Sequence, residues 1–181
     1  MSGGRTGDEE RAVVERQQVS EDAVMTRIGQ AVMLLHAGDR EEARNRLGAL
    51  WAELGSDGDP LHRCTLAHYM ADAQDDPGDE LAWDLRALTA AEAVRHTGDP
   101  GKPGESGGEG AAEHRDLPAV RAFTPSLHLN LAADYLKLHR HDAARTHLRL
   151  ARAAAAELAD DRQGRGVRAA IDRLELRLRE R

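Results

Sequence analysis

Cys64 and His68 lie four residues apart in a segment with helical periodicity. Residues at i and i+4 share one face of a helix, and a thiolate with an imidazole is a ligand pair that suits zinc. A third ligand would have to come from His62 or His128. Such pairs are common by chance, and a small apolar cysteine beside a half-exposed histidine explains this one more simply. We therefore expect no metal and no other cofactor, and keep a metal- or ligand-responsive regulatory protein as an alternative hypothesis.

Carboxylates crowd the segment from residue 72 to residue 84, where acid–base catalysis would need a pair held apart in a shielded pocket. They are Asp72, Asp75, Asp76, Asp79, Glu80 and Asp84. Most of them surround an Asp-Pro turn, where helix capping and solvation account for them. The segment GESGGEG lacks the lysine of a phosphate-binding loop, and no nucleophile–base arrangement stands out. We expect that the protein is not an enzyme.

Helices are the elements that must position these groups. A first helix begins after Ser20 and ends at Gly38, a residue type that favours the position after a helix end. Asp39 then caps a second helix, with Glu42 completing a capping box. The third and fourth helices each open with an Asp-Pro pair, Asp59-Pro60 and Asp76-Pro77.

The clearest unit runs from residue 128 to residue 151, and its pattern predicts two antiparallel helices joined by a polar turn. Large apolar residues recur at helical spacing in its first half, and small residues around one leucine line its second half. The first set is Leu127, Leu131, Tyr135 and Leu138, and the second is Ala144, Leu148, Ala151 and Ala155. Small residues that face large ones let two helix axes approach closely.

This unit resembles the tetratricopeptide repeat, a helix–turn–helix of about 34 residues. The matching positions are Leu131, Ala132 and Tyr135 in the first helix and Ala144, Leu148 and Ala151 in the second. The family's early tryptophan is replaced by His128, and its closing proline is missing. The resemblance implies an all-α array of helix–turn–helix units, about seven helices in a right-handed solenoid, whose first helices line a concave groove.

An internal repeat supports the array, because the chain matches itself at a shift of 101 residues. The matched pairs are Ile28 with Leu129, Ala31 with Ala132, Leu34 with Tyr135, Ala43 with Ala144, Arg44 with Arg145, and Leu47 with Leu148. Six agreements in kind without a gap favour a repeated unit over chance.

The repeat divides the chain into five parts. We expect a polar, largely disordered tail (1–18), two helical hairpins (19–96), a flexible Gly/Pro-rich insertion (97–116), a third hairpin (117–160) and a C-terminal capping helix (161–181). Within the third hairpin, Thr124-Pro125 either starts a new helix or kinks one longer helix. The capping helix carries one apolar stripe, formed by Val167, Ala170, Ile171, Leu174 and Leu178.

Composition narrows the class of protein. The 181 residues contain 3% aromatic residues and one cysteine, and the formal net charge is −7. That charge disfavours nucleic-acid binding, and neither a signal peptide nor an apolar run of membrane-spanning length is present. We expect a cytoplasmic protein without membrane contact, and the richness in Ala, Arg, Gly and Asp is typical of a bacterial GC-rich genome.

We therefore expect a non-catalytic protein–protein interaction module that binds a peptide or a partner helix in the groove. Carried over by position from the family, the groove residues are Cys64, His68, Asp72, Leu129, Asn130, Ala133, Leu136 and Lys137. Lys137 and Asn130 stand among apolar and acidic neighbours, which favours an apolar or basic ligand over a carboxylate. A self-associating scaffold, with Trp51 or Trp83 in a homodimer interface, is a further hypothesis.

Overall fold

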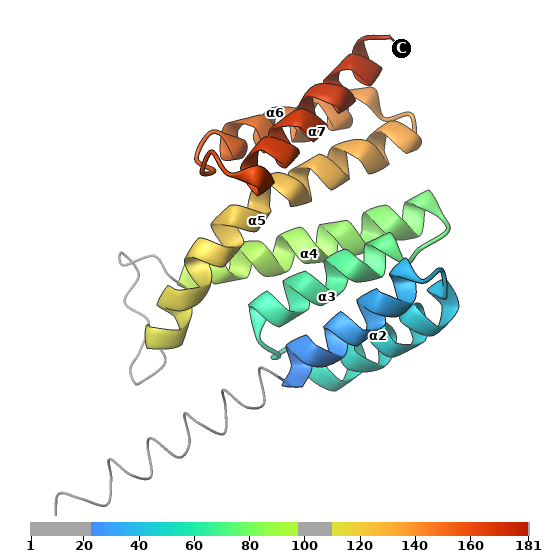
Figure 1. The fold of residues 1–181 in the computed structure, drawn as a ribbon, viewed down its shortest axis with the longest axis vertical. Coiled ribbons are helices and arrows are strands. Elements are labelled where there is room, and N and C mark those ends of the chain that lie inside the picture. The colour runs from blue at the N-terminus through green and yellow to red at the C-terminus, as the bar shows by residue number, and fades with distance from the viewer. Residues whose placement is uncertain (1–22, 98–109, 181) are drawn as a thin grey trace, which may run out of the picture.

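The computed structural model describes the backbone of residues 23–97 and 110–180 and the side chains of residues 23–94 and 118–180. Every regular element among these residues is a helix, which confirms the all-α class. A first helix covers residues 23–36, and α2 (Arg40–Leu54), α3 (Pro60–Asp72), α4 (Pro77–Thr97), α5 (Gly110–Lys137), α6 (His141–Ala155) and α7 (Arg162–Arg179) follow it. Neighbouring helices pack side by side along the molecule (Figure 1). The expected tail and Ser20 lie outside the described residues.

Aspartates fix the helix starts that the sequence predicts. The Oδ1 atoms of Asp39, Asp59 and Asp76 accept hydrogen bonds from backbone N–H groups two or three residues further on. The donors are Glu42 (3.3 Å), His62 (2.8 Å), and both Gly78 (2.8 Å) and Asp79 (3.1 Å). These bonds satisfy amides that the first turn of a helix leaves without a partner.

Helix α5 differs from the sequence-based expectation in where it begins and in its continuation past Pro125. It begins at Gly110, inside the segment 97–116 that was expected to be a flexible insertion, and continues past Pro125. Thr124 does not cap a new helix, because its Oγ1 donates to the carbonyl of Val120 within α5 (2.8 Å). The longer helix is thus the correct alternative, and it bends between its two halves (Figure 1). Pro125 is buried, so packing holds the helix across a residue that weakens it.

The chain contains two copies of a three-helix unit, and the turns show it most directly. In the first copy, Gly38 N donates to Leu35 O (3.1 Å) and Asp39 N to Leu34 O (3.0 Å). At a shift of 101 residues, the amides of His139 and Arg140 make the same two bonds, of 3.1 and 2.8 Å. Gly38 and His139 both have positive φ, at 91° and 58°. The helices that follow these turns, α2 and α6, each contain 15 residues.

Burial repeats at the same shift. The equivalent inward positions are Ile28 and Leu129, Ala31 and Ala132, Ala43 and Ala144, Leu47 and Leu148, Leu66 and Val167, Met70 and Ile171, and Ala73 and Leu174. The first copy therefore comprises the 23–36 helix, α2 and α3, and the second comprises the second half of α5 with α6 and α7. The repeat is one helix longer than the sequence match indicated.

Between the copies lies a middle cluster built from α3, α4 and the first half of α5. Trp51 and Trp83 meet edge to face at its border, with ring centroids 5.1 Å apart. The guanidinium groups of Arg63 and Arg86 lie over these rings, 4.3 and 4.5 Å from the centroids of Trp51 and Trp83. A dimer interface through either tryptophan would have to displace an arginine. None of the described helices is long and apolar enough to cross a membrane.

Candidate functional site

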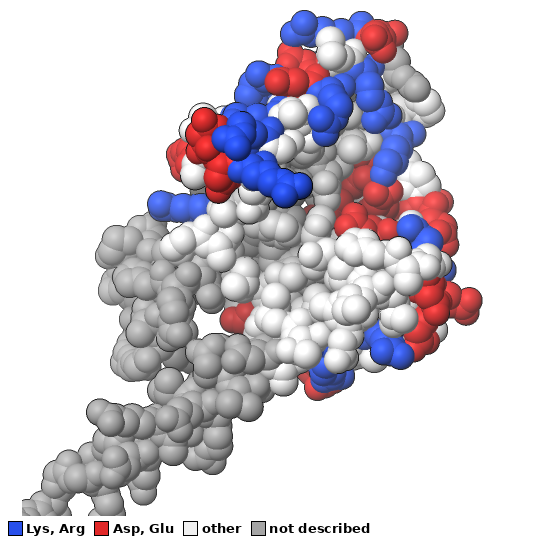
Figure 2. Space-filling view, viewed as in Figure 1, with Lys and Arg blue, Asp and Glu red and all other residues white. Residues whose placement is uncertain are grey.

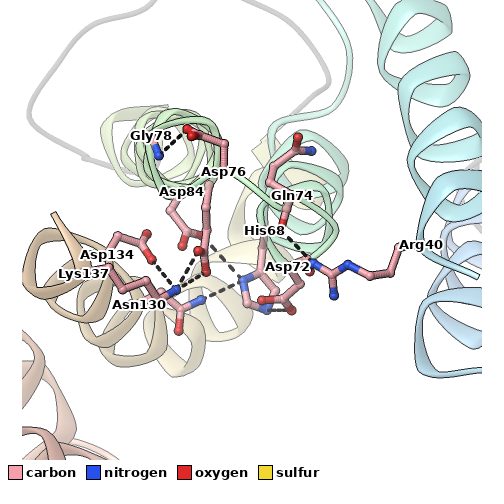
Figure 3. A network of polar contacts seen from close by, with 11 residues as sticks. Arg40, His68, Asp72, Gln74, Asp76, Gly78, Asp84, Asn130, Asp134 and Lys137 are labelled. Atoms are coloured by element: carbon pink, nitrogen blue, oxygen red, sulfur yellow. Dashed lines mark hydrogen bonds and ion pairs between the residues drawn. The ribbon is translucent and has the colours of Figure 1, made fainter. Parts of the chain in front are cut away.

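Four of the predicted groove residues meet in one polar network, although α3 and α5 are about 60 residues apart in the chain (Figure 3). They are His68 and Asp72 of α3 and Asn130 and Lys137 of α5. Helix α4 adds Glu80 and Asp84, and α5 adds Asp134. The network forms where the end of α3, the first two turns of α4 and the end of α5 lie together.

His68 joins the three helices. The amide nitrogen of Asn130 lies 3.2 Å from His68 Nδ1, a hydrogen bond when that ring nitrogen is unprotonated. Neutral His68 then carries its proton on Nε2, which faces Asp72 Oδ2 at 3.8 Å. On its other side, His68 Nδ1 lies 3.8 Å from Asp84 Oδ1. The imidazole is only 15% exposed, so it is held mainly by protein groups.

Lys137 closes the network from the solvent side. Its Nζ donates to both carboxylate oxygens of Glu80 (2.6 Å each) and to Asp134 Oδ1 (3.2 Å). Partial burial disfavours the charged amine, but the hydrogen bonds and charges of Glu80 and Asp134 outweigh that cost and raise the pKa of Lys137. Lys137 is therefore committed to two carboxylates before any ligand arrives.

Asp84 and Asp134 form a buried acidic pair, each 1% exposed. Burial, and next the charges of Asp84 and Glu80, raise the pKa of Asp134 to about 8, while the charge of Lys137 opposes the shift. Within the described residues, Asp84 Oδ1 and Asp134 Oδ2 have no hydrogen-bond donor. Asp134 is therefore largely protonated at neutral pH, because a charge on its carboxyl group would be buried beside Asp84.

The other end of the network opens to solvent at Asp72, whose side chain is 45% exposed. Among the described residues no group donates a hydrogen bond to its carboxylate, and His68 is its nearest ion-pair partner. Burial is the main cause that raises the pKa of Asp72, and His68 opposes the shift when it is protonated. Acidic side chains gather along this edge of the molecule, at the ends of the helices that build the network (Figure 2).

Of the other four predicted groove residues, two are buried in the core and two are half-buried. Cys64 is fully buried and Leu136 is 3% exposed, so placing them on the wall of an open groove was wrong. Helix α4 covers Cys64. Leu136 is enclosed by the apolar cluster that α5, α6 and α7 form together, here called the C-terminal cluster. Leu129 and Ala133 are half-buried against that same cluster.

The buried thiol bears on the zinc hypothesis. Burial, and next the charge of Asp84, raise the pKa of Cys64 to about 12. Zinc binds the thiolate, which this environment disfavours. In the described part of the chain, no group of three or more His, Cys, Asp or Glu side chains could hold a metal ion.

Asp134 is the functional candidate that sequence reasoning missed. It follows Asn130 by four residues and precedes Lys137 by three, so helical spacing alone places it on their face. What spacing cannot show is that Asp84 of α4 lies against it and that both are buried.

Comparisons with known proteins found no match for this chain. No protein-family model matches the sequence, no curated protein is significantly similar to it, and no solved structure matches the fold.

Proposed function

We propose that this protein is a non-catalytic interaction module, a tetratricopeptide-like helical array that binds a basic segment of a partner protein across the ends of α3 and α5. The carboxylate of Asp72 carries the proposal. It lies at the solvent end of an ordered network, it is about half exposed, and no described residue donates a hydrogen bond to it. A lysine or arginine of a partner would supply that donor.

The surroundings of Asp72 favour a cationic ligand over a substrate. Five carboxylates lie between the end of α3 and the first turn of α4, namely Asp72, Asp75, Asp76, Asp79 and Glu80. The nearby cations are engaged already, since Lys137 binds Glu80 while Arg40 and Arg44 bind Asp75. A surface of this sign attracts a basic segment and speeds its encounter.

The inner end of the network argues against catalysis as its purpose. Asp134, the acid with the raised pKa, is 1% exposed, and Asp84 beside it is equally buried. Neither surface pocket of 510 or 380 Å³ among the described residues is lined by a residue of the network. A general acid must lie within hydrogen-bond reach of its substrate. The pair is better placed to order α4 against α5 than to transfer a proton to a ligand.

A displayed library of random dodecapeptides, selected on the immobilised full-length protein, tests the proposal. We expect the enriched peptides to be rich in Lys and Arg. Asp72→Asn should weaken their binding about tenfold, the loss of one charge-assisted hydrogen bond. Glu157→Gln, at an exposed position in the α6–α7 loop, is the matched control and should leave affinity unchanged. Enriched peptides without a basic bias, or affinity that survives Asp72→Asn, would contradict the proposal.

A further inference from the structure

A pocket of about 510 Å³ lies between α6 and α7, in the second copy of the repeat. Its charged lining residues are three arginines, Arg145 and Arg149 of α6 and Arg179 of α7, and two acids, Asp142 and Glu175. Leu148 and Leu178 provide an apolar floor. Basic side chains are more numerous over this end of the molecule than at the acidic edge described above, although acidic side chains lie among them (Figure 2). A concave site with convergent guanidinium groups suits an anion.

The first copy of the repeat shows what an arginine at this position binds. Arg44, the equivalent of Arg145, donates from Nη1 to the backbone carbonyl of Ala73 (2.8 Å) and to Asp75 Oδ2 (2.6 Å). The bound segment is the end of α3 and the acidic turn after it. Its carbonyls lie at the negative end of the helix dipole, and its aspartate supplies a full charge.

In the second copy the corresponding segment cannot fill that role. Helix α7 does not end at Leu174, the equivalent of Ala73, but continues to Arg179. The carbonyl that would meet the arginine therefore stays within a helix, and Leu176 stands where Asp75 would be. Among the residues that the structure describes, Arg145 consequently pairs only with Asp142 of its own helix, at 3.1 Å, and both side chains are exposed.

The two other arginines of the pocket, Arg149 and Arg179, retain hydrogen-bonding capacity for an acidic ligand. Among the described residues Arg149 contacts no carboxylate, and its Nη2 donates only to Thr146 Oγ1, at 3.3 Å. Arg179 pairs with Glu175, which also accepts from Arg152. The lining therefore contains three guanidinium groups against two acids, Asp142 and Glu175, and Glu175 also pairs with Arg152, which has a second partner in Asp172.

We propose that the pocket between α6 and α7 binds an acidic segment of a partner protein, with Arg145 and Arg149 holding a backbone carbonyl and a carboxylate as Arg44 holds Ala73 and Asp75. The segment lies over Leu148 and Leu178, which exclude water from one side of these bonds and strengthen them. This pocket adds a second interaction site to the proposed function. Because the pocket does not involve Asp72, an experiment can refute one of the two sites without refuting the other.

The test uses the full-length ¹⁵N-labelled protein and a peptide with the sequence of the segment that Arg44 binds. The probe is N-acetylated, C-amidated ADAQDDP, identical to residues 71–77, and its counterpart is ANAQNNP. We expect the acidic peptide to shift the side-chain Nε–Hε signals of Arg145 and Arg149 saturably, and the amide peptide to leave them unmoved. Arg145→Gln and Arg149→Gln should each weaken binding about tenfold. Arg173→Gln, an exposed arginine outside the pocket lining, should not.

Three results would overturn the inference. The first is the absence of a saturable shift, and the second is affinity that survives both arginine substitutions. The third is equally tight binding of free succinate, which would make the site one for small dicarboxylates. The protein is also diluted without peptide. If dilution alone shifts the same signals, the occupant of the pocket is a second copy of this chain, and the proposal of a different partner protein is wrong. Asp72→Asn should leave the titration unchanged, which separates this site from the basic-segment site.

Discussion

Asp84 and Asp134 stand opposite each other at the α4–α5 interface, with Lys137, Glu80 and His68 around them (Figure 3). Asp134 holds a proton because it is buried beside Asp84 and because Lys137, which donates to it, is shared with Glu80. At the residue scale this makes Asp134 a source of pH-dependent stability. The direction follows from comparing its folded pKa with that of an aspartate in the unfolded chain.

The pKa of Asp134 rises from 3.8 to about 8 on folding. The folded protein then binds a proton that the unfolded chain releases, so the contribution to stability is complete below about pH 4 and is lost as the pH rises towards 8. We expect Asp134→Asn, which cannot ionise, to exceed the wild type by about 2 kcal/mol in free energy of unfolding at pH 9. Urea unfolding between about pH 5 and about pH 9 measures it. Asp57→Asn, at an exposed loop position, serves as control, and parallel profiles for Asp134→Asn and wild type would contradict the prediction.

His139 is a second residue whose effect on stability can be measured, because its backbone conformation is unfavourable for a side chain with a Cβ atom. It occupies the left-handed position of the α5–α6 turn, with φ of 58°, where the first copy has Gly38. Side chains with a Cβ are disfavoured there, so His139→Gly should raise the free energy of unfolding by about 1 kcal/mol. Gly38→Ala should lower it by a similar amount. Thermal melts of both variants decide the matter, and a destabilised His139→Gly would show that the imidazole contributes more than its backbone strain costs.

At the scale of elements, the two copies use one helix end differently. Arg40 and Arg44 of α2 donate hydrogen bonds to backbone carbonyls at the end of α3 and to the carboxylate of Asp75. These bonds satisfy helix-end carbonyls and favour a cation at the negative end of the dipole. Helix α7 runs past the same point, and its counterpart Arg145 is left on the surface.

The repeat therefore offers a matched pair of substitutions. Arg44→Met should cost about 1–2 kcal/mol of stability, because it removes one bond to a backbone carbonyl and one to a carboxylate from a side chain that is 30% exposed. Arg145→Met should cost less than about 0.5 kcal/mol, because a surface pair within one helix contributes little. Chemical denaturation measures both. Equal losses would mean that the arginine stabilises α2 and α6 themselves rather than the end of the next helix.

At the scale of the whole molecule, three apolar clusters follow one another along the array. Each helix packs mainly on its sequence neighbours, with contacts between α3 and α5 and between α5 and α7 linking successive units. In such an array, stability is close to a sum of local units and the interfaces between neighbours. Damage at one end should therefore remain near that end.

Leu174→Ala tests whether destabilisation at the C-terminal end of the array stays local. Leu174 is 5% exposed in the C-terminal cluster, and its truncation should cost about 2–4 kcal/mol. We expect hydrogen exchange to show lost protection in α6 and α7, with α2 and α3 little changed. Met70→Ala, a deep position on the equivalent face of α3, should reverse the pattern. Uniform loss of protection in either variant would indicate that the chain unfolds as one cooperative unit.

The sequence by itself determined the helices, three of their aspartate caps, the left-handed turn at Gly38 and the 101-residue repeat. These features depend on neighbours within one or two turns, where capping bonds, glycine geometry and the 3.6-residue period act directly. The resemblance to the tetratricopeptide repeat also led to the expectation that His68, Asp72, Asn130 and Lys137 lie on one surface, and the structure brings these four together. The tertiary structure decided what depends on facing helices: the unbroken α5, the burial of Cys64 and Leu136, and the pairing of Asp84 with Asp134. It alone showed that α7 overruns the point where α3 ends, which leaves Arg145 beside an open pocket. Burial and pKa follow from distances across elements that no local pattern encodes.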